Sequence, residues 1–303
     1  MLSDKQKKHI LVNRDGLKYY TVEGLEKVHE EMLRLLLIID TIAKENNIPY
    51  WIDGGSLIGI VRHKGFIPWD DDIDVNMPRN DYDRFIKMMK ECEGHIAEHL
   101  KVEFPEHTVY PFAKISDDRT LLIEFPDKYP MEVGVYIDIF AKDGILDDSF
   151  SSKTVCMISK ILGRLHWFSK FSIYAWRKSK NLGKKVVAVI GRVCIKKGTM
   201  AIRLQDKLIH WNQKKHPLEK CKYVTTLTNG EFHKIAPKEC FSRYVMLDFE
   251  NQKFRCPVGY DTYLKCLYPG DYMQLPPENK RVHHNTVVYW KTQEDKAEYY
   301  KNA

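Results

Sequence analysis

Several features of other protein classes are missing from this 303-residue chain. It has no stretch approaching the ~18 consecutive apolar residues of a transmembrane helix, and its first residues, Met-Leu-Ser-Asp-Lys-Gln-Lys-Lys, lack the apolar core of a secretory signal. Its seven cysteines are odd in number and form no Cys-x-x-Cys pair, which argues against a disulfide framework or a structural zinc site. These absences predict a cytoplasmic protein with reduced thiols.

Acidic residues are absent from residues 149–205, where thirteen lysines and arginines occur. The net charge of +7 therefore divides into +13 in this segment and −6 in the rest of the chain. Trp, Phe and Ile residues are interleaved with the basic ones, as in an interfacial helix attracted to anionic lipid. A helical subdomain with a solvated basic face is the alternative. We expect peripheral contact with an anionic membrane, at the inner face of the cell membrane, or with an anionic glycan. No nucleic-acid motif accompanies the charge, so we expect no nucleic-acid partner.

What the chain does contain is most informative between residues 51 and 77. An acidic cluster, Asp70, Asp71, Asp72 and Asp74, lies there among apolar residues. Side chains alternate faces along a strand, so Asp72 and Asp74 should point the same way on either side of Ile73. Carboxylates that close repel unless a cation or a proton lies between them, and oxygen ligands suit Mg²⁺ or Mn²⁺.

Upstream of these acids, Gly54-Gly55-Ser56 predicts a tight turn that cradles a phosphate. Glycines let backbone N–H groups approach closely, and the Ser56 hydroxyl adds a donor. A helix over residues 57–62 would point its N-terminus at the same place. Gly-Gly-Ser alone is any tight turn, and an Asp run alone is usually a solvated loop. Together they indicate metal-assisted phosphoryl transfer from a nucleotide donor, with Arg62, His63 and Lys64 near enough in sequence to help bind phosphate.

The hydrophobic pattern predicts an α/β (α+β) fold with a mixed sheet and flanking helices. Asp138 lies inside a β-branched and aromatic run. It either faces water from an edge strand or, as we favour, is a third metal carboxylate brought beside Asp72 and Asp74 by strand pairing. Expected helices span residues 22–43, 57–62, 80–92 and 201–211, and expected strands span residues 50–52, 73–75, 101–104, 112–115, 121–124 and 135–140.

Residues 206–281 are expected to mix a helix with loops and turns. Their many aromatic residues predict a surface that stacks on a ring or binds a sugar. Arg281, His283 and His284 are further candidates for holding phosphate. Paired histidines are about as often structural, hydrogen-bonded groups, and that interpretation stays open.

Three separated blocks of the chain, in the right order, resemble the LicD family. The first runs from Gly54-Gly55-Ser56-Leu57 through His63-Lys64-Gly65-Phe66-Ile67-Pro68-Trp69-Asp70-Asp71-Asp72-Ile73-Asp74, the second is Ile137-Asp138-Ile139-Phe140, and the third covers residues 268–281. The likeness spans roughly residues 23–284. Two departures are Ala141-Lys142-Asp143-Gly144, where the family tends to have Pro-Leu-Asp-Gly, and the proline in Tyr268-Pro269-Gly270-Asp271.

The family is known as phosphocholine transferases of bacterial surface glycans, and the eukaryotic fukutin-related ribitol-phosphate transferases are similar to it. The resemblance implies a nucleotidyltransferase-type fold and a CDP-linked donor. It implies that Gly55 and Ser56 contact the donor phosphate, that Asp72 and Asp74 hold Mg²⁺, and that Asp138 is the third carboxylate. The expected acceptor is a hydroxyl of a cell-surface glycan precursor (lipopolysaccharide, teichoic acid or capsule), which could be lipid-linked.

We therefore expect residues 1–303 to form a single catalytic unit of LicD type. A nucleotidyltransferase-like core (20–148), a basic amphipathic helical segment (149–205) and a C-terminal region completing the site (206–303) are its expected parts. Phosphocholine is the expected transferred group, with ethanolamine, glycerol and ribitol phosphates open beside it.

Two other function classes are weighed against this one. A glycosyltransferase also uses Asp-x-Asp with Mn²⁺ and a nucleotide sugar, but it needs no Gly-Gly-Ser upstream and normally has a Rossmann-like half that this sequence does not show. A non-catalytic, membrane-associated scaffold would keep the fold without the acids, so the intact Asp72, Asp74 and Asp138 argue against it.

Overall fold

The computed structural model describes residues 20–21, 24–92, 95–124, 131–170, 199–230, 234–281 and 287–291. Ten strands of this part of the chain form one mixed sheet, which confirms the predicted α+β class. The main path of neighbouring strands is β1 (Tyr20–Thr21), β12 (Val287–Trp290), β6 (Ala113–Glu124), β7 (Met131–Ile145), β3 (Asp74–Pro78) and β2 (Trp51–Ile52). Strands β5 (Leu100–Glu103) and β4 (His95–Ala97) extend from β6, and β8 (Tyr223–Thr225) and β9 (Ala236–Pro237) extend from β7.

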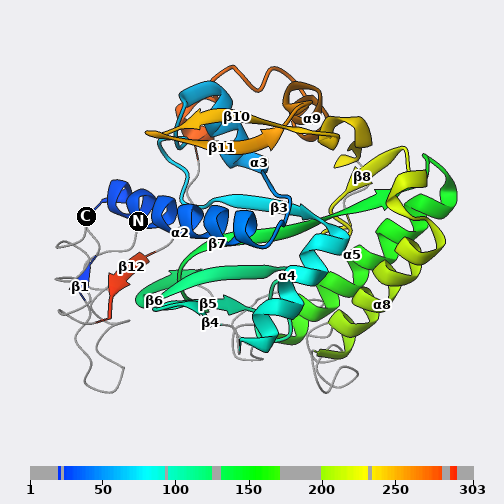
Figure 1. The fold of residues 1–303 in the computed structure, drawn as a ribbon, viewed down its shortest axis with the longest axis horizontal. Helices are drawn as coiled ribbons and strands as arrows, with labels where there is room; N and C mark the ends of the chain where they lie inside the picture. The colour runs from blue at the N-terminus through cyan, green and yellow to red at the C-terminus, as the bar shows by residue number, and fades with distance from the viewer. Residues whose placement is uncertain are drawn as a thin grey trace.

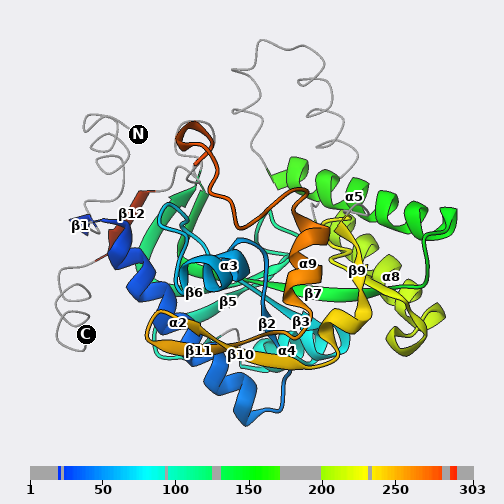
Figure 2. The same cartoon turned by 90° about the horizontal axis from the view of Figure 1, so that it is seen from above.

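Helices cover this sheet, and a separate hairpin lies above it in Figure 1. The helices are α2 (Leu25–Glu45), α3 (Gly54–Ile58) with a following π-helical turn η1 (Gly59–His63), α4 (Arg79–Glu91), α5 (Phe150–Lys170), α8 (Thr199–Lys215) and α9 (Tyr260–Leu267). Short 3₁₀ turns are η2 (Leu218–Lys220), η4 (Lys238–Phe241) and η5 (Glu278–Lys280). The hairpin pairs β10 (Tyr244–Phe249) with β11 (Gln252–Pro257). It lies with α3 and α9 on one side of the sheet, while α5 and α8 pack together at one end (Figures 1 and 2).

The core forms where the 3–4 spacing of α2 meets the sheet. Met32, Leu35 and Leu36 of α2 are fully buried, as are Ile115 of β6 and Ile137 of β7. The predicted helices over residues 22–43, 80–92 and 201–211 correspond to α2, α4 and α8. Alternation of buried and polar positions explains how β3 and β7 can keep an apolar face on this core and carry acids on the other.

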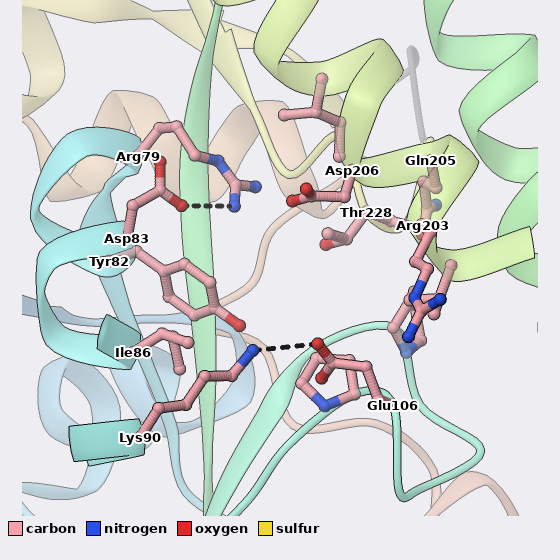
Figure 3. A pocket seen from close by; sticks show the side chains of 14 residues that line it. Arg79, Tyr82, Asp83, Ile86, Lys90, Glu106, Arg203, Gln205, Asp206 and Thr228 are labelled. Carbon is pink, nitrogen blue, oxygen red and sulfur yellow. Dashed lines mark hydrogen bonds and ion pairs between the residues drawn. The ribbon is translucent and has the colours of Figure 1, made fainter. Parts of the chain in front are cut away.

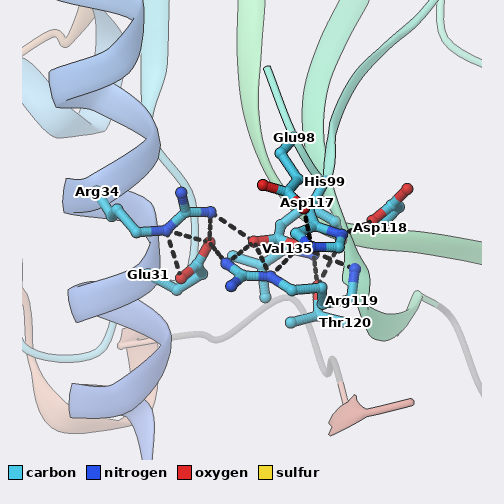
Figure 4. Close-up of polar contacts among 9 residues, drawn as sticks. All are labelled: Glu31, Arg34, Glu98, His99, Asp117, Asp118, Arg119, Thr120 and Val135. Atoms are coloured by element: carbon cyan, nitrogen blue, oxygen red, sulfur yellow. Dashed lines mark hydrogen bonds and ion pairs between the residues drawn. The ribbon is translucent and has the colours of Figure 1, made fainter. Parts of the chain in front are cut away.

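A buried charge cluster ties α2 to β6 (Figure 4). Arg34 of α2 lies 2.5 Å from both Glu31 and Asp117, and Arg119 also pairs with Asp117 at 2.5 Å. The backbone N–H of Arg119 donates to Asp117 as well, at 2.8 Å. Burial raises the pKa of Glu31 to about 7, whereas hydrogen bonds from Arg119 hold the pKa of Asp117 below its ordinary value despite burial. Glu31 is therefore the proton-binding member of the cluster.

The strands predicted over residues 112–115 and 121–124 are one continuous strand, β6. The intervening Asp117-Asp118-Arg119 reads as a polar loop in sequence, but the cluster with α2 neutralises Asp117 and lets the strand continue. A register shift between Asp117 and Leu122 accommodates this stretch in the β6–β7 pairing. The expectation of two short strands was therefore wrong.

The loop-and-turn description of residues 206–281 was also incomplete. The region contains β8, β9, the β10–β11 hairpin and α9 in addition to the predicted helix. The aromatic residues at 260 and 263, expected in turns, lie in α9 because Tyr263 and Leu264 form its buried face. This helix supplies a side chain to the candidate site described below.

The basic segment is described in part. Helix α5 ends at Lys170 and α8 begins at Thr199, so about half of the predicted amphipathic segment 149–205, residues 171–198, lies outside the described residues. Phe150, Met157 and Ile161 of α5 are exposed large apolar side chains. None of the helices found in the described residues combines the length and the apolar character that crossing a membrane requires.

Candidate active site

Parallel pairing of β3 with β7 brings two predicted acids together. Asp74 is the register partner of Asp138. Asp72 lies two residues before the start of β3, and Asp72 and Asp74 are both half-buried while Ile73 between them is fully buried. Asp138 is only 7% exposed on a strand flanked by β6 and β3. The predicted approach of Asp138 to Asp72 and Asp74 is confirmed, and the edge-strand alternative is wrong.

Like charges surround Asp74. Burial, followed by the charges of Asp72, Asp138 and two further aspartates, raises the pKa of Asp74 well above its ordinary value. Carboxylates held this close share a proton or a cation at neutral pH. The cluster therefore has the electrostatic character of a site for a positive charge.

Asp138 has a cation of its own, Lys114. The Lys114 ammonium, on β6, donates to Oδ1 of Asp138 at 2.7 Å and lies 3.3 Å from the ring centroid of Tyr136. Burial raises the pKa of Asp138 to about 6, although Lys114 acts in the opposite direction. Its Oδ2 receives no hydrogen bond from the other described residues.

Gly54, Gly55 and Ser56 form the first turn of α3, and Asp53 is the residue before it. The prediction of a free-standing turn followed by a helix from residue 57 was therefore wrong by three residues. Gly54 has φ +54°, and a Cβ there would collide with Oδ2 of Asp74. A Cβ on Gly55 would lie 3.0 Å from Oδ2 of Asp70. The glycines thus let two carboxylates lie against the start of the helix, where backbone N–H groups are unpaired within the helix.

Ser56 links this turn to β3. The backbone N–H of Asp74 donates to Oγ of Ser56 at 2.9 Å, and the N–H of Asp53 donates to the carbonyl of Asp74 at 2.9 Å. The Ser56 side chain is buried. Because Oγ accepts this bond, its own proton is available for an acceptor near Asp74.

The loop that carries the acids is held from two sides. His29 of α2 stacks on Phe66 with ring centroids 3.9 Å apart and donates from Nε2 to the carbonyl of Asp70 at 2.7 Å. Glu250, at the tip of the β10–β11 hairpin, accepts from the N–H of Phe66 at 3.1 Å and donates its own N–H to the carbonyl of Lys64 at 2.7 Å. Helix α2 and the hairpin together fix the approach of Asp70–Asp74 to α3.

The predicted basic residues gather around Trp69 from two parts of the chain. The Arg281 guanidinium lies 4.9 Å from the Trp69 ring centroid, and His63 meets the same ring edge-on. Arg62 donates to the carbonyl of Tyr272 at 2.8 Å, which joins η1 to the C-terminal region. Lys64 ends η1 in a left-handed conformation, and its side chain is exposed. The candidates His283 and His284 lie outside the described residues.

A second buried network was missed from the sequence. The Lys142 ammonium of β7 donates to Asp53 at 3.0 Å, to the Thr226 hydroxyl at 3.3 Å and to the hydroxyl of Tyr263 from α9. The Tyr263 hydroxyl also donates to Asp53. Burial alone would raise the pKa of Asp53, but the charge of Lys142 and the hydrogen bonds from Lys142 and Tyr263 together outweigh it and hold that pKa below its ordinary value. A charged residue inside an apolar strand, the signal that identified Asp138, also marks Lys114 and Lys142.

The aspartates of the cluster were also considered as ligands of a metal ion. In the part of the chain that is described, no three His, Cys, Asp or Glu side chains are arranged as a metal site. The available donor set is nevertheless all oxygen, and burial together with the charge of Asp72 raises the pKa of Asp74. This chemistry fits a hard divalent cation, for which carboxylate oxygens are the preferred protein ligands.

A different cavity, of about 150 Å³, lies between α4 and α8 (Figure 3). Two ion pairs lie in its lining: Arg79 is 3.5 Å from Asp83, and Lys90 is 2.9 Å from Glu106. Arg79 follows the end of β3 opposite Asp74, so this cavity is remote from the carboxylate cluster. We assign it no role in the chemistry.

Sequence comparison with known proteins shows which family the chain belongs to. Residues 47–100 match the family model described as "LicD/FKTN/FKRP, nucleotidyltransferase domain". The chain is 32% identical over 276 residues to a Haemophilus influenzae protein named lipopolysaccharide cholinephosphotransferase LicD, an alignment covering 86% of this chain and 97% of that protein. An uncharacterized Rickettsia prowazekii protein is 33% identical over 73 residues, which cover 24% of this chain and 27% of that protein. An uncharacterized Rickettsia typhi protein is 30% identical over 97 residues, 31% of each chain. With the carboxylate-bearing strands and the glycine turn within the aligned range, the chain belongs to the LicD family.

Proposed function

We propose that this protein transfers phosphocholine from a CDP-linked donor to a hydroxyl of a cell-surface glycan. The Haemophilus relative carries the name of a lipopolysaccharide cholinephosphotransferase. The observation that carries the proposal is Asp74, whose pKa is raised by burial and by neighbouring carboxylates directly beside the start of α3. Clustered carboxylates next to backbone N–H groups suit a metal-neutralised phosphate.

Asp72 and Asp74 would hold Mg²⁺ or Mn²⁺, with Oδ2 of Asp138 as a third oxygen. Such a cation, when bound, neutralises the donor pyrophosphate and the charge that develops on the leaving CMP. The N–H groups of Gly55 and Ser56 and the Ser56 hydroxyl would contact the same phosphate. Arg281 on Trp69 and Arg62 beside His63 would add positive charge at the rim. His63, whose Nε2 accepts the Arg62 N–H and whose pKa is lowered by burial and by Arg62, would contribute a hydrogen bond from its neutral ring.

The reaction breaks the phosphoanhydride bond of the donor and forms one new P–O bond. The acceptor hydroxyl oxygen attacks the phosphorus that carries choline, CMP leaves with the bridging oxygen and its electron pair, and the hydroxyl proton is released. Asp138 is our candidate to accept that proton when it is not a metal ligand. Lys114 holds Oδ1 of Asp138, which orients Oδ2 for either role.

Helix α5 is the proposed contact with the membrane. Its exposed Met157 and Ile161 lie on a segment rich in lysine and arginine. Apolar side chains among basic ones suit the surface of an anionic bilayer. This placement at the inner face of the cell membrane would suit a lipid-linked acceptor.

A donor screen tests the proposal. Purified protein with Mg²⁺ is incubated with CDP-choline, CDP-ethanolamine, CDP-glycerol, CDP-ribitol and UDP-sugars, each with and without a glycan acceptor. We expect CMP release from CDP-choline that depends on Mg²⁺ and on the acceptor. UDP release from a nucleotide sugar, without CMP, would instead make the protein a glycosyltransferase.

A further inference from the structure

A polar cavity of about 130 Å³ lies directly beside the carboxylate cluster. Asp74 forms part of its wall, together with Thr226 and Asn229 from the loop after β8 and Tyr268 after α9. None of the roles assigned above uses this space. Its position next to Asp74 means that any group bound there lies beside the phosphate that is transferred.

The charges that line the cavity are balanced. Two aspartates, Asp53 and Asp74, and two lysines, Lys142 and Lys234, belong to its lining. Lys142 has three N–H donors, and Asp53, Thr226 and Tyr263 accept all three. Lys142 therefore shapes the wall without offering a donor to an anion. A quaternary ammonium would meet two lysines as well as two aspartates, so the lining offers no net attraction to a charged group of either sign.

Neutral hydrogen-bonding groups remain available in the lining. Neither the Asn229 amide nor the Tyr268 hydroxyl has a hydrogen-bond partner among the described residues, and both side chains are half-buried at the cavity. Phe140 and Tyr263 add aromatic surface. Hydroxyl and amide groups beside aromatic rings suit a hydroxyl-bearing ring, which has polar edges and apolar faces.

The volume of the cavity also fits a single sugar ring. A protein cavity of about 150 Å³ holds one benzene molecule, so this cavity of about 130 Å³ accommodates a single six-membered ring rather than a whole nucleoside. We propose that the cavity is the acceptor subsite and binds a neutral sugar ring, with a ring hydroxyl directed at the phosphate beside Asp74. The proposal rests on the proposed function and names the acceptor side of the same site.

Binding of small probes to the full chain, measured without turnover, tests this proposal. The probes are methyl glucoside and methyl galactoside as neutral rings, glucose 6-phosphate, choline and CMP, each titrated by ligand-observed NMR. The test variants are Asn229→Ala and Tyr268→Phe. The matched control is Asn80→Ala, an exposed amide on α4 at the opposite end of β3.

We expect a neutral methyl glycoside to bind, and each test variant to weaken it about three- to tenfold, the effect of one lost hydrogen bond. The control and the affinity for CMP should stay within about twofold of the unmodified chain. Weaker CMP binding in the test variants would assign the cavity to the nucleotide and overturn the proposal. Unchanged binding of every probe would overturn it too. Failure of the proposed function would show separately, as absence of CMP release from every CDP donor.

Discussion

Replacing Asp74 by asparagine should separate catalysis from stability. Asn keeps the size of the side chain but removes the negative charge that Asp72, Asp138 and burial oppose. Loss of a carboxylate that we propose to bind the metal should abolish CMP release, whereas loss of repulsion should leave the folded state as stable as before or more so. Most buried polar substitutions reduce stability, so this combination is specific to a strained functional site.

The expected size of the stability change follows from linkage. Each unit by which folding raises the pKa of Asp74 reflects about 1.4 kcal/mol of unfavourable interaction with its ionised form. Relieving that interaction should raise the melting temperature, and each kcal/mol relieved is worth about 2–4 °C in a domain of 150–250 residues and less in a longer chain. The side chain is half-buried, so solvent screening places the expectation at the low end.

The assay is differential scanning fluorimetry with and without Mg²⁺, alongside CMP release from CDP-choline. Mg²⁺ should stabilise the unmodified chain by mass action and have no such effect on Asp74→Asn. Asp148→Asn, an exposed aspartate paired with Lys153, is the matched control and should change neither property. A fully active Asp74→Asn protein would refute the metal role. A melting temperature lowered by several degrees would refute the repulsion argument.

Four further predictions test other parts of the structure. Lys114→Met removes the ammonium that stabilises ionised Asp138, so the midpoint of the acid limb of kcat against pH should move upward from about 6; an unshifted limb would separate Asp138 from turnover. Glu31 binds its proton more tightly in the folded state, with a pKa of about 7, so unfolding free energy should fall on the order of 2 kcal/mol as pH rises from about 5 to 8. Urea melts should show that Glu31→Gln lacks this fall, and an equal fall in both proteins would place the titrating group elsewhere. Lys142→Met leaves buried Asp53 without its cation, so it should cost about 3–5 kcal/mol in chemical denaturation, and a loss below about 1 kcal/mol would contradict the network. Met157→Ser with Ile161→Ser should reduce flotation with anionic vesicles, while the exposed Met246→Ser control should not; equal flotation would assign the membrane contact elsewhere.

The carboxylate site could largely be predicted from the sequence, because side chains alternate between the two faces of a strand. A period of two places Asp72 and Asp74 on one side of β3, and an acid in the middle of a buried β-branched strand requires a partner. Those two facts were enough to predict that Asp138 meets them. The resemblance to the LicD family then supplied the chemistry, which strand geometry alone does not contain.

Contacts between residues far apart in the sequence could not be predicted in the same way. Nothing local to Lys142 indicates that it meets Asp53 and Tyr263, because their contact depends on α9 returning to the sheet. Likewise, the strand β6 continues through Asp117 because Arg34 of α2 joins Arg119 in neutralising it. Local propensity predicts a loop there, and tertiary ion pairing overrides that propensity.

The central claim is transfer of phosphocholine to a sugar hydroxyl at the Asp72–Asp74–Asp138 cluster. Its most direct test incubates the unmodified chain with CDP-choline, Mg²⁺ and lipopolysaccharide oligosaccharide, then follows CMP by chromatography and the oligosaccharide by mass spectrometry. The account predicts equal amounts of CMP and of oligosaccharide carrying one added phosphocholine in a phosphodiester, and neither product when Mg²⁺ is chelated. An unmodified oligosaccharide beside a full yield of CMP, or transfer that continues without a divalent cation, would contradict it.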